Sequence, residues 1–188
     1  MVKIKAINLR SSKEFIREKF GEDGLKKVID SLSGEDRNIV NTALPSSWIP
    51  QDIWIRFYET VVRELAAGDE SIVREAGSFT ANKELSSIHR LFLKLGNPEN
   101  IAKKVPVLAE TYFSADEHKM EATASKLDEN KYLIVVGKFE PRQRLIEIGI
   151  LGWLENAFRL SGAKNLRIEL TKSLSQGDGS IEYIVTWQ

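Results

Sequence analysis

Two histidines, His89 and His118, are the side chains in this sequence that could bind a metal or a heme. Neither is spaced from another His, Asp or Glu as a pair of metal ligands on one helix face, and the chain contains no cysteine. We therefore expect no metal site. His89 lies in a predicted helix and could ligate a heme axially. The commoner use of such positions is a histidine at the edge of the core, or in solvent for His118.

Nucleophilic catalysis has no motif in this sequence. Serines are plentiful, but no G-x-S-x-G elbow is present. The segment Gly177-Asp178-Gly179 lacks the strand-then-helix context of a phosphate loop, and it predicts a hairpin turn instead. We expect that the protein is not an enzyme.

Basic side chains gather where a long apolar helix is expected to begin, at Lys138, Arg142 and Arg144. Backbone N–H groups at a helix N-terminus point outward and favour negative charge. These three residues are therefore candidates for binding an anion, and a solvated charged face is the alternative.

Large aromatic side chains are the remaining candidates for a site. Trp54, Tyr112 and Trp153 carry much apolar area and could line a ligand pocket, although core packing is the commoner use of such residues. Gly149 and Gly152 lie one turn apart in the long apolar helix. They create a flat strip that another backbone or a flat ligand could approach closely.

Composition describes an ordinary globular chain of 188 residues, with 27 basic and 27 acidic side chains and 42% hydrophobic residues. We expect a single domain, residues 1–188. Balanced charge gives little drive for binding nucleic acid. Apolar runs are far shorter than the roughly 20 residues of a membrane span, and Lys3 and Lys5 interrupt any signal-peptide core. Cytoplasm is the expected location.

Two patterns of hydrophobic spacing divide the chain into a helical part, residues 1–114, and a sheet-and-helix part, residues 115–188. Short amphipathic helices are expected throughout the first part, among them one from Ser11 to Gly21 and another from Leu25 to Gly34. Ser11 and Ser12 would cap the first of these. Asn97 would cap a later helix with Pro98 at its first position.

After residue 112 the period changes to two, which indicates strands. A hairpin is expected from residues 119–124 and 132–139, the second strand being apolar enough for burial on both faces. A helix over 142–160 and two further strands near 165–170 and 181–187 follow. The predicted fold class is α+β, with the N-terminal helical part packed on a C-terminal β-β-α-β-β unit. In that unit the long helix covers one face of a four-stranded, mainly antiparallel sheet.

Several segments together resemble a large uncharacterised bacterial family expanded in myxobacteria. The resemblance covers nearly the whole chain and rests on the order and spacing of residues 20–25, 48–50, 97–99, 112–113, 152–163 and 177–187. That family looks like a branch of the ligand-binding superfamily of heme nitric-oxide/oxygen sensors, four-vinyl-reductase domains and the TRAPP vesicle-tethering subunits.

The resemblance implies helices packed on a four-stranded sheet, with a pocket between them that holds heme or another apolar ligand in different branches. Heme sensors clamp the propionates with a Tyr-x-Ser-x-Arg motif on a strand. Here Tyr132 could match the clamp's tyrosine, but Ile134 and Val136 stand where Ser and Arg should be. We therefore expect no heme and no other cofactor.

The sequence thus predicts a non-enzymatic sensory or regulatory module that binds a small apolar ligand or a protein partner. Trp54, Tyr112, Tyr132 and Trp153 are the expected pocket residues. The strip at Gly149 and Gly152, with the apolar strand that ends at Trp187, further predicts a homodimer. The alternative is a scaffold or tethering-type interaction protein, whose aromatics fill the core and leave no pocket.

Overall fold

The computed structural model describes residues 2–87, 97–115, 122–137 and 144–188. His89, His118, Lys138 and Arg142 lie outside these residues. The helices are α1 (Ile7–Asp30), α2 (Gly34–Thr42), α3 (Gln51–Leu65), α4 (Ser71–Ser87), α6 (Pro98–Tyr112) and α7 (Arg144–Leu160). The strands are β1 (Val2–Lys5), β2 (Trp48–Pro50), β3 (Phe113–Ala115), β4 (Ala122–Asp128), β5 (Lys131–Gly137), β6 (Arg167–Lys172) and β7 (Ser180–Thr186), with a short 3₁₀ turn at Leu174–Gln176.

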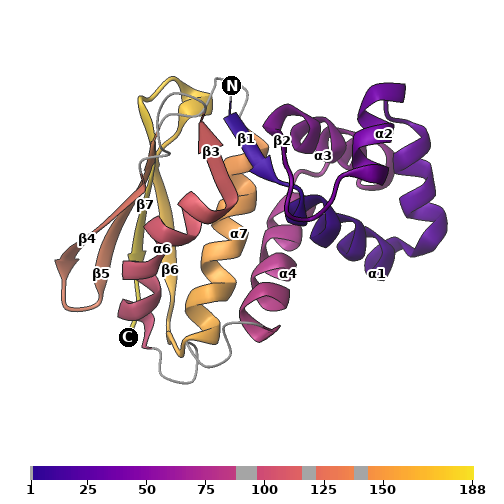
Figure 1. The fold of residues 1–188 in the computed structure, drawn as a ribbon. Helices are drawn as coiled ribbons and strands as arrows, with labels where there is room; N and C mark the ends of the chain where they lie inside the picture. Colours follow the sequence, from indigo (N-terminus) through magenta and orange to yellow (C-terminus); the bar gives the residue numbers. More distant parts are fainter. Residues whose placement is uncertain (1, 88–96, 116–121, 138–143) are drawn as a thin grey trace.

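The C-terminal sheet has four antiparallel strands in the order β4-β5-β7-β6, which confirms the predicted α+β class and the β-β-α-β-β unit. Its central strand β5 alternates between buried and half-buried residues. The expectation that this strand is buried on both faces is therefore wrong. Only the face with Tyr132, Ile134 and Val136 is enclosed, because α6 and α7 cover the sheet from that side alone (Figure 1).

Polar contacts fix α7 over the sheet. Glu147, in the first turn of α7, is buried and accepts hydrogen bonds from the hydroxyls of Ser173 and Ser175 at 2.8 and 2.9 Å. The Tyr183 hydroxyl on β7 donates to the Glu147 carbonyl at 2.8 Å. Burial raises the pKa of Tyr183 well above its ordinary value, so this donor keeps its proton.

A second sheet, in the order β2-β1-β3, was not expected from the sequence. Its strands have only three or four residues each, and they come from widely separated places in the chain. Such strands are too short for alternation to be visible. This sheet joins the start of α1 to the end of α6, because β1 pairs with β3 directly after Tyr112.

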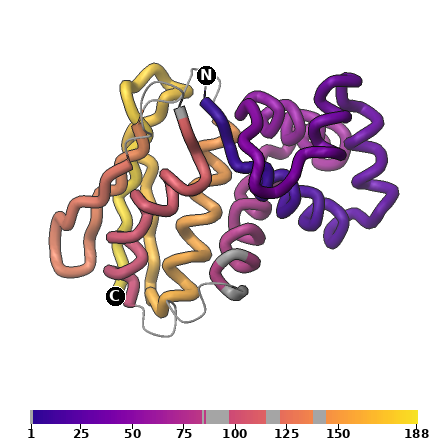
Figure 2. The backbone as a smooth tube through the Cα atoms, in the orientation of Figure 1, coloured from indigo at the N-terminus to yellow at the C-terminus, as the bar shows by residue number. Residues whose placement is uncertain are grey.

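Gly21 separates two helical segments within α1, Ile7–Asp30, as the sequence predicted, because its φ and ψ are not helical. Gly21 has φ of 76°, a left-handed conformation that favours glycine and kinks the helix. The bend of the segment Ile7–Asp30 can be followed in Figure 2. The first helix begins at Ile7 and not at Ser11, so Ser12 lies inside it and not at its cap, and the Ser12 hydroxyl donates to the Asn8 carbonyl at 2.7 Å.

Helices α4 and α7 pack so closely that their backbones touch, and we call this contact the α4–α7 seam. A Cβ atom placed on Gly152 would lie 1.9 Å from the Arg74 carbonyl oxygen, and one on Gly77 would lie 2.1 Å from the Gly149 carbonyl oxygen. An ion pair between Arg74 and Glu155 closes one edge of the seam.

The seam corrects the argument for a homodimer. The glycine strip is buried against α4 of the same chain and is not an exposed surface. Trp187 is also buried, at 6% exposure, between the rings of Tyr132 and Phe158. The two features that predicted self-association are thus used within the chain itself.

Candidate ligand cavity

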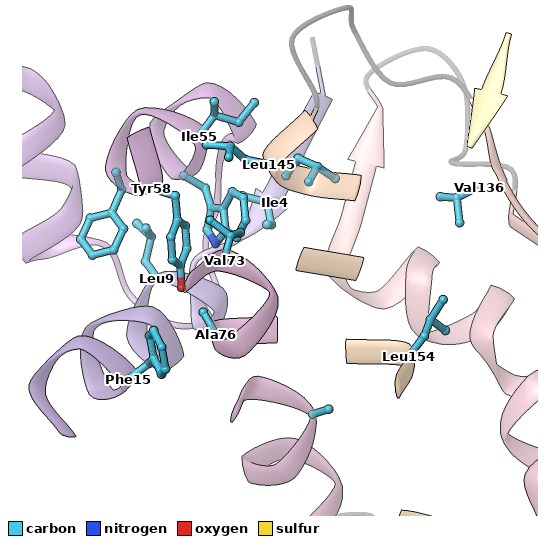
Figure 3. Close-up of a cluster of buried hydrophobic side chains, with 14 of the residues drawn as sticks. Ile4, Leu9, Phe15, Ile55, Tyr58, Val73, Ala76, Val136, Leu145 and Leu154 are labelled. Atoms are coloured by element: carbon cyan, nitrogen blue, oxygen red, sulfur yellow. The ribbon is translucent and has the colours of Figure 1, made fainter. Parts of the chain in front are cut away.

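A cavity of about 110 Å³ lies where the N-terminal helices meet the α6–α7–sheet layer. Residues of β1, α1, α3 and α4 line one side, and residues of α6, β3, β5 and α7 line the other. Figure 3 shows members of both sides, with Ile4, Tyr58 and Ala76 apart from Val136 and Leu154. The cavity therefore forms only when distant segments of the chain pack together.

Three of the four expected pocket residues line this cavity, namely Trp54, Tyr112 and Trp153. Trp54 is on α3, which buries one broad apolar stripe, and its ring lies 4.4 Å from the Tyr58 ring. Tyr112 ends α6, and Trp153 is on α7 one residue after the seam glycine Gly152.

Tyr132 is not among the residues that line the cavity. Its hydroxyl donates to Glu99 Oε1 at 3.1 Å, and its ring stacks on Trp187 with 5.8 Å between centroids. Burial raises the pKa of Tyr132. Glu99 also pairs with Lys103, whose hydrogen bond is the main cause that lowers the pKa of this carboxyl. The polar group of Tyr132 is thus satisfied by the protein.

The described residues that line the cavity are almost entirely apolar, and none of them carries a charged side chain. The small polar part of the lining comes from Asn8 and Ser12 of α1, Tyr58 of α3 and Thr80 of α4, in addition to Tyr112 and Trp153. Sequence reasoning missed Asn8, Ser12, Tyr58 and Thr80. Tyr58 follows Phe57 in the apolar stripe of α3, and this was the one available signal, because a buried tyrosine needs a partner for its hydroxyl.

The basic residues proposed for an anion are represented in the described part of the chain by Arg144 alone. Its side chain is 64% exposed and forms an ion pair with Glu70, which raises the pKa of the guanidinium. The charge of Arg144 is therefore already neutralised by a carboxylate, which weakens the case for an anion there.

Metal chemistry has no support in the described residues. Nowhere in ranges 2–87, 97–115, 122–137 and 144–188 do three or more His, Cys, Asp or Glu side chains gather to hold a metal ion. Within the same ranges, no helix is long and apolar enough to cross a membrane.

Comparison with known proteins relates this geometry to a fold. The sequence matches no protein-family model and no curated protein. The structure is similar to an H-NOX protein from S. oneidensis in the Fe(II)NO ligation state, with a TM-score of 0.77 and 13% sequence identity. The match covers 98% of this chain and 99% of that one. The chain has the fold of H-NOX domains.

Two further solved structures agree with this comparison. The Fe(II) unliganded H-NOX protein from K. algicida aligns with a TM-score of 0.73 and 12% identity over 98% of this chain and 97% of that one. A mutant of T. tengcongensis H-NOX aligns with a TM-score of 0.72 and 13% identity, covering 98% of each chain. These three proteins share the fold of this chain over nearly the full length of each chain.

The described residues do not fit a heme, the group that a further similar structure of the H-NOX family names. Sites for cofactors and drug-sized ligands usually have volumes of roughly 300–1,000 Å³, whereas this cavity has about 110 Å³. No histidine, cysteine or methionine is among the described residues that line it. On β5, Ile134 and Val136 are buried and apolar at the two positions where the clamp would need Ser and Arg.

Proposed function

We propose that this protein is a non-enzymatic sensory or regulatory module that binds a small apolar ligand, without heme, in the cavity between its helical part and its sheet. The observation that carries the proposal is the lining, which is apolar and uncharged and is built from both parts of the chain. A ligand held there contacts both parts at once, so its binding free energy couples to their relative position.

Size restricts the ligand class. An engineered apolar cavity of about 150 Å³ stays dry and binds benzene or xenon. The present cavity, at about 110 Å³, is slightly smaller. We therefore assign it a ligand of at most the size of a single six-membered ring.

The heme-free part of the proposal is supported by the small size of the cavity. Trp54 and Trp153 project into this region, and the α4–α7 seam leaves no gap between the two helices beside it. The non-enzymatic part is supported by the lining itself. Among its described residues no acid stands beside a base, and no nucleophile stands beside a histidine.

Native mass spectrometry of protein purified from its own host tests the proposal. We expect a retained small molecule that is displaced by added benzene. Ala109→Leu enlarges a lining residue on α6 and should abolish retention. Val107→Leu is the matched control, because Val107 is on the same helix but is 64% exposed.

The opposite result has a clear meaning. If neither a retained molecule nor benzene or xenon binds to the unmodified protein, the cavity is a packing defect. The scaffold or tethering-type alternative would then replace the ligand-binding proposal.

A further inference from the structure

We infer that this protein docks peripherally on an anionic lipid surface through one small face that is both basic and apolar, on the outer side of the β2-β1-β3 sheet. We call this face the Trp48 surface, and its residues are Lys3, Lys5, Leu44, Trp48 and Pro50. The inference goes beyond the proposed function and does not depend on a ligand in the cavity.

Two large apolar side chains of this surface are exposed to solvent. Leu44 is 67% exposed and Trp48 is 40% exposed. The turn between them is fastened to the start of α1, because the Ala6 amide donates to the Ser47 carbonyl at 2.9 Å. The fold thus holds both apolar side chains in water, where each has a free-energy cost that burial in an apolar environment would remove.

A lysine lies against both exposed side chains' supports. The Lys5 ammonium is 4.1 Å from the centroid of the Trp48 ring, and it donates to the Ser46 carbonyl at 3.0 Å. Ser46 belongs to the same turn as Leu44. The positive charge and the apolar groups therefore share one face.

Alternation along β1 places a second lysine on this face. Val2 and Ile4 are buried, so Lys3 and Lys5 point to the opposite side of the strand. The register with β2 agrees, since Lys5 is opposite Trp48 and Lys3 is opposite Pro50. Ile4 lines the cavity, so the cavity and the Trp48 surface lie on opposite sides of one sheet.

The charge of the surface selects an anionic partner. The segments that form this sheet and its turn, residues 2–5, 43–50 and 113–115, contain no Asp or Glu. Glu14, the first acid of α1, already pairs with Arg10 at 3.1 Å. Anionic headgroups attract lysines that lie close to a membrane surface. The local excess of positive charge in a chain with 27 basic and 27 acidic residues thus complements such a surface.

The residue types favour lipid over an acidic protein. Tryptophan prefers the boundary between headgroups and acyl chains, and lysine can bury its stem there while its ammonium stays with the phosphates. A stable protein interface usually needs about 20–30 residues on each side, which is far more than the Trp48 surface offers. Peripheral docking requires no membrane-spanning helix.

Flotation of the full chain with vesicles tests the inference. We expect binding to phosphatidylcholine vesicles that contain about one-third phosphatidylserine, and at least about tenfold weaker binding to phosphatidylcholine alone, because each lysine near the surface adds roughly a factor of five. Lys5→Gln should weaken binding to the anionic vesicles about fivefold. Added salt should weaken it in the unmodified protein.

Two further variants test the apolar part of the surface. Leu44→Ser should weaken binding to the anionic vesicles. Leu127→Ser is the matched control and should not, because it removes an exposed leucine near the end of β4. Brominated acyl chains should quench tryptophan fluorescence of the vesicle-bound protein, and this quenching should be lost in Trp48→Phe.

Absence of binding to the anionic vesicles would overturn the inference, and so would equal binding by Leu44→Ser and Leu127→Ser. An acidic protein would then be the remaining partner for this surface. Neither result bears on the binding of benzene, so the proposed function stands or fails separately.

Discussion

The α4–α7 seam and the cavity border the same helix, yet they are packed in opposite ways. In the seam two backbones touch through Gly77 and Gly152, and no space remains for even one added carbon. A few ångströms away, side chains from several elements leave about 110 Å³ empty. Gly149 belongs to both regions, since its carbonyl faces Gly77 and its open side faces Trp54. The comparison shows that the cavity is not the result of generally loose packing.

The cost of the cavity supports the same view. Empty volume in a core destabilises by about 24 cal/mol per Å³, so about 110 Å³ costs roughly 2–3 kcal/mol. Enlarging Ala76 or Ala109 would be a simple way to recover that free energy. The small side chains of Ala76 and Ala109 instead leave space that a ligand could occupy.

The largest expected effect is in the seam. Gly152→Ala places a Cβ atom 1.9 Å from the backbone oxygen of Arg74, so α4 and α7 must separate. We expect the free energy of unfolding to fall by about 3 kcal/mol or more, measured by urea denaturation. Gly34→Ala is the control, because nothing lies within 4 Å of its added Cβ. An unchanged stability for Gly152→Ala would mean that the seam is looser than described.

The next effect concerns Tyr132, which belongs to neither region. Tyr132→Phe removes its hydrogen bond to Glu99 and should lower the free energy of unfolding by about 1–1.5 kcal/mol. A double-mutant cycle with Glu99→Ala should return a coupling of similar size. Weaker binding of benzene by the Tyr132→Phe variant would show that Tyr132 contributes to the cavity, and it would contradict the position of Tyr132 outside the lining.

Gly149 offers the sharpest contrast with Gly152. An added Cβ at Gly149 meets Trp54 at 3.4 Å and Val73 at 3.7 Å, which is ordinary van der Waals contact. Since alanine favours a helix over glycine by up to about 1 kcal/mol, Gly149→Ala should be neutral or slightly stabilising. It should also weaken benzene binding, because it narrows the cavity. A loss of stability comparable to that of Gly152→Ala would erase the distinction between the two regions.

The smallest effect is expected in acid, at an ion pair whose two residues belong to neither region. Arg56 binds the two carboxylate oxygens of Asp36 at 2.7 and 2.8 Å, and this contact lowers the pKa of Asp36. The folded pKa is below the ordinary value of 3.8, so the stabilisation is present above that pH and is lost as the pH falls further. Unfolding midpoints measured from about pH 5 to about pH 2 should depend less on pH in Asp36→Asn. If that variant shows the same acid profile, other carboxyl groups dominate it.

Regular elements were the part of the fold that the sequence could predict. The alternation of Ile181, Tyr183 and Val185 indicated β7, and Asn97 caps α6 through a hydrogen bond from the Asn100 amide, with Pro98 at the first helical position as expected. These features depend on neighbours in the sequence, so local patterns contain them.

The features that could not be predicted depend on contacts between distant segments. Nothing near Gly152 indicates that Arg74 lies against it, so the sequence could not decide between helix packing within the chain and an exposed surface. The β1–β2–β3 sheet likewise joins residues that no local pattern connects. For the site, Trp54, Tyr112 and Trp153 were chosen by size and chemistry, whereas Ser12 and Tyr58 line the cavity only because α1 and α3 pack against the rest of the chain.

The seam also has a consequence for how the chain folds. Its ion pair joins residues 81 positions apart, Arg74 and Glu155, so closing it carries the entropy cost of a long loop. Contacts of this separation slow folding relative to local helix formation. During synthesis α4 is made well before α7. The face of α4 that packs on α7 therefore stays exposed to solvent until α7 has left the ribosome. Docking of α7 is therefore the late step that unites the two parts of the molecule and creates the cavity.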